Sequence, residues 1–223
     1  MARVIAIDGP SGAGKSSVSR IVGKKLGFLH VDSGALYRIM TWQALVRKVD
    51  TDNPEAVTAF APTVEIECRP ENGAIAYYVG GEPPGERIRT PEINAHASQV
   101  ATVKAVRDKI TALLRDMTRF GDLVVEGRDI TTAVFPDSPA RFYLTASAEA
   151  RAMRRQKEEV EKGIANQSAE TVKASLLARD AIDSTRKYAP LRKADGAIEI
   201  DSSDLTLEQV VDIVLEKIHE TFN

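Results

Sequence analysis

The sequence predicts an α/β fold in which a parallel sheet of five strands is flanked by helices. Two observations support this prediction. Short apolar runs alternate with helical patterns along the chain, as they do in successive βαβ units. A glycine-rich phosphate-binding motif also stands between the first apolar run and the first helical pattern.

The expected strands lie near residues 4–7, 28–31, 122–127, 140–145 and 197–201. Each apolar run is followed by a turn or a helical stretch, which a parallel sheet needs for its crossovers. The first helix is indicated by apolar residues that fall on one helical face, namely Val18, Ile21, Val22 and Leu26. The last helix is expected over Leu205–Phe222.

An antiparallel hairpin is expected between the second and third parallel strands. Apolar and charged residues alternate from Val64 to Arg69, and Ile75, Tyr77 and Val79 form a second run of period two. Asn72–Gly73 between them is a typical hairpin turn. A helix over 91–119 is expected to follow, so the chain is larger than a minimal nucleotide-binding core.

The composition indicates a folded protein of a reducing compartment. The 223 residues are 43% hydrophobic and 28% charged, and the net charge of −2 argues against a nucleic-acid polymer or a membrane surface as partner. The single cysteine cannot form an internal disulfide. The N-terminal apolar run is too short for a secretory signal and no stretch is long enough to span a bilayer, so a cytoplasmic location is expected.

The phosphate-binding motif is G-x-x-x-x-G-K-S. Its glycines let backbone N–H groups converge on phosphate oxygens at a helix N-terminus, and its lysine reaches the β- and γ-phosphates. A serine hydroxyl after the lysine is a ligand for Mg²⁺. The predicted ATP-binding residues are Gly9, Pro10, Ser11, Gly12, Ala13, Gly14, Lys15, Ser16 and Ser17.

Three carboxylates are candidates for a place beside the metal ion. Glu126 ends the apolar run of 122–127, and Asp8 and Asp32 each follow a strand of their own. A carboxylate at such a position can equally cap a turn or a helix. The predicted metal-linked residues are Glu126, Ser16 and Ser17.

Arginines indicate what receives the phosphoryl group. The Asn-Lys-x-Asp signature with which a GTPase reads guanine is missing from the sequence, whereas arginines recur in patterned settings. Their planar fork suits bidentate phosphate binding and spreads the charge of a transferring phosphoryl group. Arg179, Asp183 and Arg186 are spaced to share one helical face, which an exposed salt-bridge ladder would also explain.

Six segments in register resemble bacterial cytidylate kinases, and the resemblance covers essentially the whole chain. They are DGPSGAGKSS, VDSGALYR, ASQVATVKAVR, VEGRDITTAVFPD, RDAIDSTRKYAPL and IDSSDLTLEQVV. The resemblance implies a P-loop kinase with a core over 1–60, 120–150 and 190–223. It also implies a nucleoside-monophosphate-binding insertion over 61–119 and a helical lid over 151–189.

The resemblance also implies roles for individual residues. Ser33, Arg107 and Asp129 would read the cytosine, while Ser98, Arg179 and Asp183 would face the ribose. Residues implied at the acceptor phosphate or next to it in the same motif are Tyr37, Arg38, Arg128 and Arg186. The lid would contribute Arg154 and Arg155, so that the expected catalytic set is Lys15, Arg128, Arg154, Arg155 and Arg186.

The activity that this resemblance implies is phosphoryl transfer from ATP, with Mg²⁺, to CMP and dCMP, by a monomeric enzyme. The family often has Gly-Thr after the lysine where this chain has Ser16–Ser17, so either hydroxyl is a candidate for Mg²⁺.

Two alternatives remain open on the sequence. The same fold can phosphorylate another nucleoside monophosphate or a small acid such as shikimate, although the adenylate-kinase DGFPR signature is missing. A nucleotide-dependent regulator without a transfer reaction is the other alternative.

Overall fold

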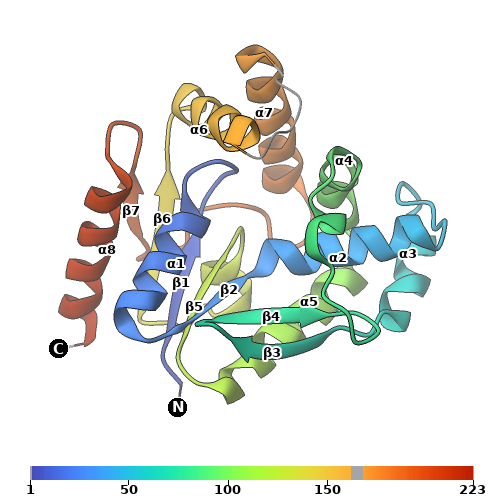
Figure 1. The fold of residues 1–223 in the computed structure, drawn as a ribbon, viewed down its shortest axis with the longest axis horizontal. Coiled ribbons are helices and arrows are strands. Elements are labelled where there is room, and N and C mark those ends of the chain that lie inside the picture. Colours follow the sequence, from blue (N-terminus) through green and yellow to red (C-terminus); the bar gives the residue numbers. More distant parts are fainter. Residues whose placement is uncertain (1, 162–167, 223) are drawn as a thin grey trace.

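The computed structural model describes residues 2–161 and 168–222, and these residues form a seven-stranded sheet in the order β3-β4-β2-β5-β1-β6-β7 (Figure 1). The neighbours from β2 to β7 pair in parallel, which confirms the predicted sheet of five parallel strands. The strands are β1 (Val4–Asp8), β2 (Leu29–Asp32), β3 (Glu67–Glu71), β4 (Ala74–Tyr78), β5 (Leu123–Gly127), β6 (Ala140–Thr145) and β7 (Ile198–Asp201).

The two further strands are the predicted hairpin, which extends the same sheet. β3 and β4 pair in antiparallel register, and β4 joins the edge of β2 where His30 lies opposite Ala74. Asn72 and Gly73 both have positive φ values, 49° and 78°, as this turn requires. The sequence predicted the hairpin but not its attachment to the sheet.

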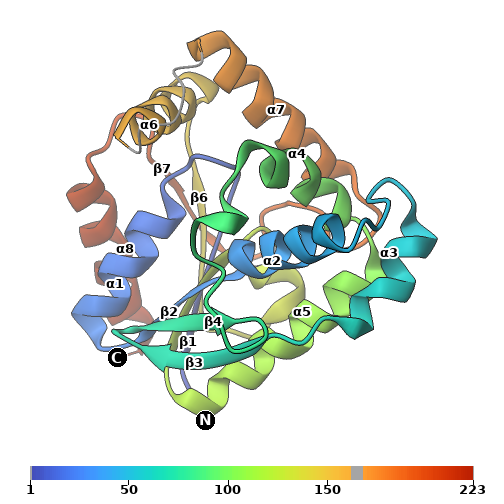
Figure 2. The same ribbon diagram turned by 45° about the vertical axis from the view of Figure 1, so that its right-hand side comes forward.

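Helices cover both faces of the sheet (Figures 1 and 2). One face packs through a hydrophobic cluster onto α2 to α5, and the other packs onto α1 and α8. The helices are α1 (Lys15–Leu26), α2 (Ser33–Val46), α3 (Pro54–Phe60), α4 (Pro91–Val100), α5 (Lys104–Asp116), α6 (Ala148–Glu161), α7 (Ala169–Thr185) and α8 (Leu207–Phe222).

The single helix expected over 91–119 is wrong, because the chain breaks it between α4 and α5. Val103 has an extended backbone, and the Thr102 hydroxyl donates to the carbonyl of Gln99. The break leaves the carbonyl of Ala101 free to accept a 3.0 Å hydrogen bond from Arg107 Nη1. The break therefore orients the side chain of Arg107, which the sequence predicts to lie in the site.

The helices α6 and α7 pack together above the carboxyl ends of the parallel strands (Figure 1). Ala152, Val172 and Leu176 form a small buried cluster between them. These helices lie in the segment predicted as a lid, of which residues 162–167 lie outside the described residues. The division of the chain into core, insertion and lid remains a prediction.

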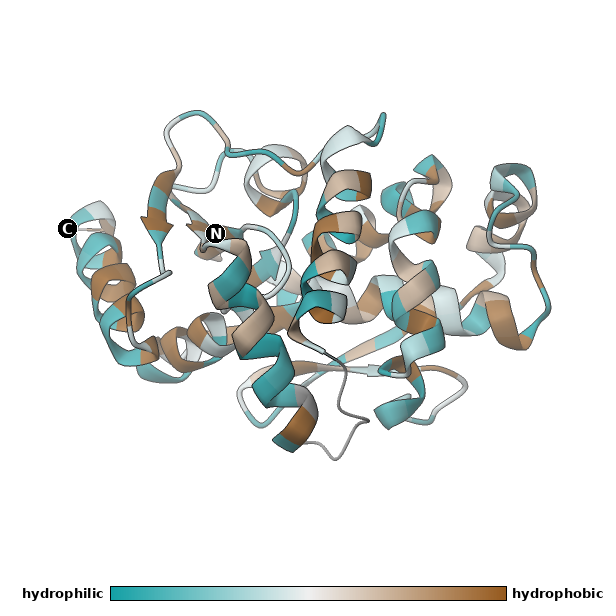
Figure 3. Ribbon diagram, turned by 90° about the horizontal axis from the view of Figure 1, so that it is seen from above, coloured by the Kyte–Doolittle hydropathy of each residue, from teal (hydrophilic) through white to brown (hydrophobic). Residues whose placement is uncertain are grey.

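Along the helices, hydrophobic and hydrophilic residues alternate as expected of elements with one buried side (Figure 3). In the described part of the chain, every helix falls short of the length and apolarity needed to cross a membrane.

Candidate functional site

The phosphate loop runs from the end of β1 to the start of α1, at the carboxyl edge of the sheet. Gly9, Gly12 and Gly14 all have positive φ values, which side chains disfavour. A Cβ on Gly9 would lie 1.9 Å from the carbonyl oxygen of Leu144 on β6. The loop passes so close to the sheet that only glycine fits there.

Lys15 is buried at the first position of α1 and folds back over the loop. Its Nζ donates a 2.8 Å hydrogen bond to the carbonyl of Pro10. Burial and, to a smaller extent, the positive charge of Arg128 lower the pKa of Lys15 to about 7, although Glu126 acts in the opposite direction. Near pH 7, a bound anion would therefore be needed to keep the amino group of Lys15 fully protonated.

Glu126, the predicted metal-side acid, ends β5 beside the loop, and its carboxylate contacts the hydroxyl of Ser16. Burial alone would raise the pKa of Glu126. The contacts with His30, Lys15 and Ser16 outweigh burial and lower that pKa to about 2. The structure thus places an ionised carboxylate and the Ser16 hydroxyl together, a donor set that fits Mg²⁺.

The competing carboxylates have structural partners. Asp8 accepts hydrogen bonds from the backbone N–H groups of Ile130 and Thr131 and from the Thr131 hydroxyl, and burial raises its pKa to about 6. Asp32 caps α2 through the N–H of Ala35 and pairs with Arg38 at 2.9 Å. Of the three candidates, Glu126 is therefore the one placed beside Ser16.

A group of arginines faces the loop from the other side. Arg179 on α7 is surrounded by the positive charges of Arg128, Arg38 and Arg155. Burial and these neighbours lower the pKa of Arg179 to about 10. Its Nε is buried without a hydrogen-bond partner among the described residues, so the arrangement is suited to an anion.

Arg128 connects the two sides. It lies close enough to Lys15 to lower the pKa of that lysine, and its Nε donates a 3.1 Å hydrogen bond to Asp183 on α7. The charge of Arg128 thus acts on both Lys15 and Arg179, and Asp183 partly compensates it.

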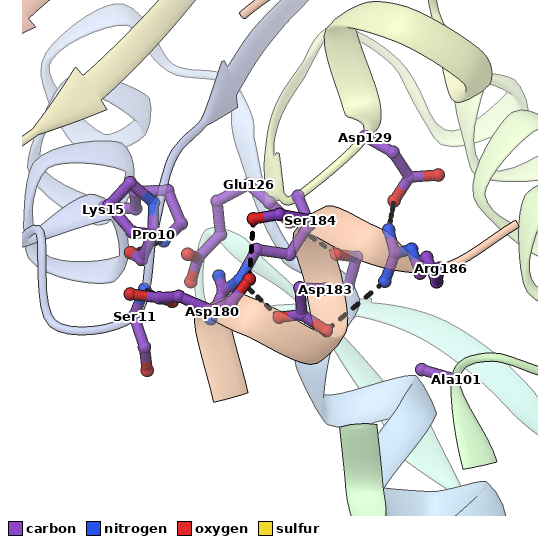
Figure 4. Close-up of polar contacts among 12 residues, drawn as sticks. Pro10, Ser11, Lys15, Ala101, Glu126, Asp129, Asp180, Asp183, Ser184 and Arg186 are labelled. Carbon is purple, nitrogen blue, oxygen red and sulfur yellow. Dashed lines mark hydrogen bonds and ion pairs between the residues drawn. The ribbon is translucent and has the colours of Figure 1, made fainter. Parts of the chain in front are cut away.

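A buried network of opposite charges lies farther from the loop (Figure 4). Asp129 forms an ion pair with Arg107 and accepts a 3.4 Å hydrogen bond from Arg186. Arg186 also pairs with Asp183 at 3.5 Å and donates to the carbonyl of Ala189. A cavity of about 370 Å³ next to Arg107 and Asp129 gives this network an open side.

The one-face spacing of Arg179, Asp183 and Arg186 is only partly correct, because α7 ends at Thr185 and Arg186 has an extended backbone beyond it. Arg186 reaches Asp183 from that cap position. An exposed salt-bridge ladder does not account for the Arg186–Asp183 ion pair, because these side chains are only 2% and 6% exposed.

Three other predicted residues lie on the helices α2 and α4, which pack against each other. Ser33 begins α2 and donates a 2.6 Å hydrogen bond to the carbonyl of Glu126. The ring of Tyr37 lies 5.4 Å from the Arg107 guanidinium, and burial raises the pKa of its hydroxyl. Ser98 is buried on α4.

The two predicted lid arginines point to different places. Arg155 lies near Arg179 and pairs with Glu158 at 3.4 Å. Arg154 instead donates to the hydroxyl and the carbonyl of Ser202, in the loop after β7. The structure therefore brings Arg155, but not Arg154, to the arginine group.

Sequence reasoning missed Arg151 and Asp180, which form an ion pair and both contact Ser11 of the phosphate loop. Both lie inside segments singled out for other residues, and their spacing alone does not distinguish them. Only the packing of α6 and α7 against the loop reveals them.

Comparison with known proteins shows the family of this chain. The family model described as cytidylate kinase matches residues 5–220. The chain belongs to the cytidylate kinase family. A cytidylate kinase of Streptomyces avermitilis is 43% identical, with 97% of this chain and 93% of the relative covered. One of Geobacillus sp. is 40% identical, with 97% and 96% covered.

Among solved structures, an uncharacterized protein from Eubacterium ventriosum superposes with a TM-score of 0.51 at 11% identity, covering 97% of this chain and 98% of that one. This likeness concerns the fold alone. The cytidylate kinase family membership confirms the resemblance found in the six sequence segments, and the chain is a phosphotransferase with a P-loop kinase fold.

Proposed function

We propose that this protein transfers the γ-phosphoryl group of ATP to CMP and dCMP, giving ADP with CDP or dCDP. The observation that carries the proposal is that Arg128 interacts electrostatically with both Lys15 and Arg179 and is held by Asp183 of α7. Two anionic nucleotides can meet there end to end, with cations where their charges would otherwise repel.

The donor side is formed by the phosphate loop. The backbone N–H groups between Gly9 and Ser17 bind the phosphates of ATP, except at Pro10, which has none, and at Ser11, whose N–H donates to Asp180. Lys15 contacts the β- and γ-phosphates. Ser16 and Glu126 would hold Mg²⁺, directly or through water, and Ser17 is the alternative hydroxyl. When bound, this ion neutralises charge that develops on the phosphate oxygens.

The acceptor side combines phosphate, ribose and base contacts. Arg38, Arg128 and Arg186 bind the acceptor phosphate. We assign Arg179, which the resemblance implies at the ribose, to this phosphate as well, because its buried Nε has no hydrogen-bond partner among the described residues. Ser98 and Asp183 face the ribose, and Tyr37 lines the pocket. Asp129 accepts from the cytosine amino group, and Arg107 and Ser33 complete the recognition of the base edge.

Transfer itself needs little chemistry from the side chains. The loose transition state is stabilised when the reacting oxygens are held in line and the spreading charge meets fixed cations. The helices α6 and α7 would cover this space, where Arg155 would help to exclude water, whereas Arg154 is bound to Ser202. We propose further that the enzyme acts as a monomer in the cytoplasm, since one chain supplies every residue named here.

The proposal is tested by ADP release measured with a panel of acceptors. CMP and dCMP are expected to accelerate ADP release by at least about 10³-fold over ATP alone. Acceleration by another monophosphate or by shikimate, and none by CMP, would overturn the assigned acceptor. ATP binding without turnover on any acceptor would favour a regulator.

The lowered pKa of Lys15 predicts a pH dependence of ATP use. Because the lysine of the free enzyme loses its proton as the pH rises through about 7, kcat/KM for ATP is expected to fall above that pH. The value of kcat falls less, because the bound triphosphate favours the protonated amine. Steady-state kinetics with ATP between pH 6 and 9 measure both parameters.

Lys15→Arg provides the control for this profile, because a guanidinium stays charged over the whole range. Its kcat/KM for ATP should be lower but should lack the lysine-dependent decline. Identical profiles for the two proteins would show that Lys15 does not titrate there.

A further inference from the structure

Both backbone polar groups of Ser11 are bound by side chains from α6 and α7. The Ser11 N–H donates a 3.0 Å hydrogen bond to Asp180 Oδ1, and its carbonyl accepts a 3.0 Å hydrogen bond from Arg151 Nη1. Arg151 and Asp180 also form an ion pair with each other. The three groups thus close a ring that joins the phosphate loop to two helices.

The ring is buried and fixed at several points. The side chains of Arg151 and Asp180 are 7% and 14% exposed. Arg151 Nε donates to the carbonyl of Ala146, and a Cβ on Gly12 would lie 3.1 Å from the Cβ of Arg151. The loop therefore packs directly against α6, and its first residues cannot shift without moving this ion pair.

The same helix that holds the donor loop carries the acceptor cations. Asp180 follows Arg179 directly, and Asp183 lies one turn later with Arg128 bound to it. Figure 4 shows Asp180 at the loop end of this stretch and Asp183 next to Arg186 at the other end. A change in the loop at Ser11 is therefore transmitted along one short rigid helix to the acceptor side.

We propose that Asp180 and Arg151 are positioning residues that couple ATP binding at the phosphate loop to the placement of the arginines that bind the acceptor. This inference rests on the proposed function. Phosphates seated in the loop fix Ser11, Ser11 fixes Asp180, and Asp180 fixes the turn of α7 that carries Arg179. Because coupling is reciprocal, CMP strengthens ATP binding by the same factor.

The experiment measures the dissociation constant of CMP by calorimetry, with and without a saturating non-hydrolysable ATP analogue and Mg²⁺. The wild-type protein is expected to bind CMP about tenfold more tightly in the presence of the analogue. Asp180→Ala should reduce this factor to within twofold of one, with the affinity for CMP alone nearly unchanged. Its kcat should fall by about 10- to 100-fold.

Two further variants make the result specific. Asp180→Asn retains an oxygen for the Ser11 N–H but loses the charge that faces Arg151. An intermediate coupling factor between ATP and CMP is therefore expected. This variant tests the inference if Asp180→Ala does not fold. Glu149→Gln removes the Glu149–Lys173 ion pair, which joins α6 to α7 without contacting the loop. This control variant should have the same coupling factor and the same kcat as the wild-type protein.

A wild-type coupling factor and kcat in both Asp180 variants would overturn the inference. A change in ATP affinity with an unchanged coupling factor would also overturn the inference. It would show that the Asp180 carboxylate acts on ATP only through its charge. Loss of the factor in Glu149→Gln as well would show that general packing of the two helices, and not this ring, transmits the effect. Failure of the proposed function is distinguishable, since the wild-type protein would then not phosphorylate CMP at all.

Discussion

Replacing Arg179 by methionine is expected to lower kcat/KM for CMP by about 10³-fold while making the folded protein more stable. The loss follows from removing a charged donor at the acceptor phosphate. The gain follows from the lowered pKa of Arg179, about 10, which shows that burial and the charges of Arg128, Arg38 and Arg155 oppose its positive charge in the folded state. Methionine fills similar space without that charge, and we expect a gain of about 1–2 kcal/mol in the free energy of unfolding.

Steady-state kinetics and urea unfolding at pH 7 measure the two effects on one preparation. Arg20→Met on the exposed side of α1 is the matched control and should change neither quantity appreciably. An Arg179→Met protein that is less stable and fully active would show that this guanidinium has a structural role and does not bind phosphate.

Replacing Gly9 by alanine is expected to cost more than about 4 kcal/mol of stability, which is enough to unfold many proteins of this size. The added Cβ would lie 1.9 Å from the carbonyl oxygen of Leu144, in a backbone conformation with φ of +149°. The clash involves the backbone of β6, which cannot rotate away, so β1 and β6 would have to separate at the carboxyl edge. Denaturant unfolding followed by circular dichroism measures the loss.

Gly14→Ala separates the steric effect from the conformational one. Gly14 has φ of +91° with no atom within 4 Å of an added Cβ, so only the strain of a positive φ remains, about 1–2 kcal/mol. Equal losses for the two variants would contradict the steric argument.

The sequence predicted the parallel sheet because periodicity is a local property. The run at 4–7 corresponds to β1, which is buried on both faces and therefore apolar throughout. The run at 140–145 corresponds to β6, in which buried and half-buried residues alternate. The hairpin was predicted for a similar reason, as Asn72 and Gly73 tolerate the left-handed backbone. Its pairing with β2 could not be predicted, because that contact is decided by a single bridge at His30.

The break between α4 and α5 shows where local patterns fail. The residues from Pro91 to Arg119 keep a helical period, and neither glycine nor proline interrupts them between 101 and 103. Arg107 stabilises the break through its hydrogen bond to the carbonyl of Ala101, and its ion pair with Asp129 from another part of the chain holds the side chain in place. Propensity alone does not contain that information.

Within the site, the motif predicted the loop and Lys15, and the resemblance predicted the acceptor residues. The geometry adds distinctions that spacing cannot supply. Asp8 and Glu126 both end buried strands, yet Asp8 binds the backbone at 130–131 and Glu126 contacts Ser16. Arg154 and Arg155 are adjacent in sequence and therefore point in different directions from one helix.

In the proposed complex the two nucleotides meet end to end, next to the cations Lys15, Arg128 and Arg179. The most direct test is the affinity for adenosine and cytidine joined through a pentaphosphate, measured by calorimetry with Mg²⁺. Because one molecule would fill both halves of the site, we predict one bound per chain with an affinity at least about 100-fold above that of ATP or CMP alone. Binding no tighter than that of ATP, or displacement by ATP but not by CMP, would contradict the shared site.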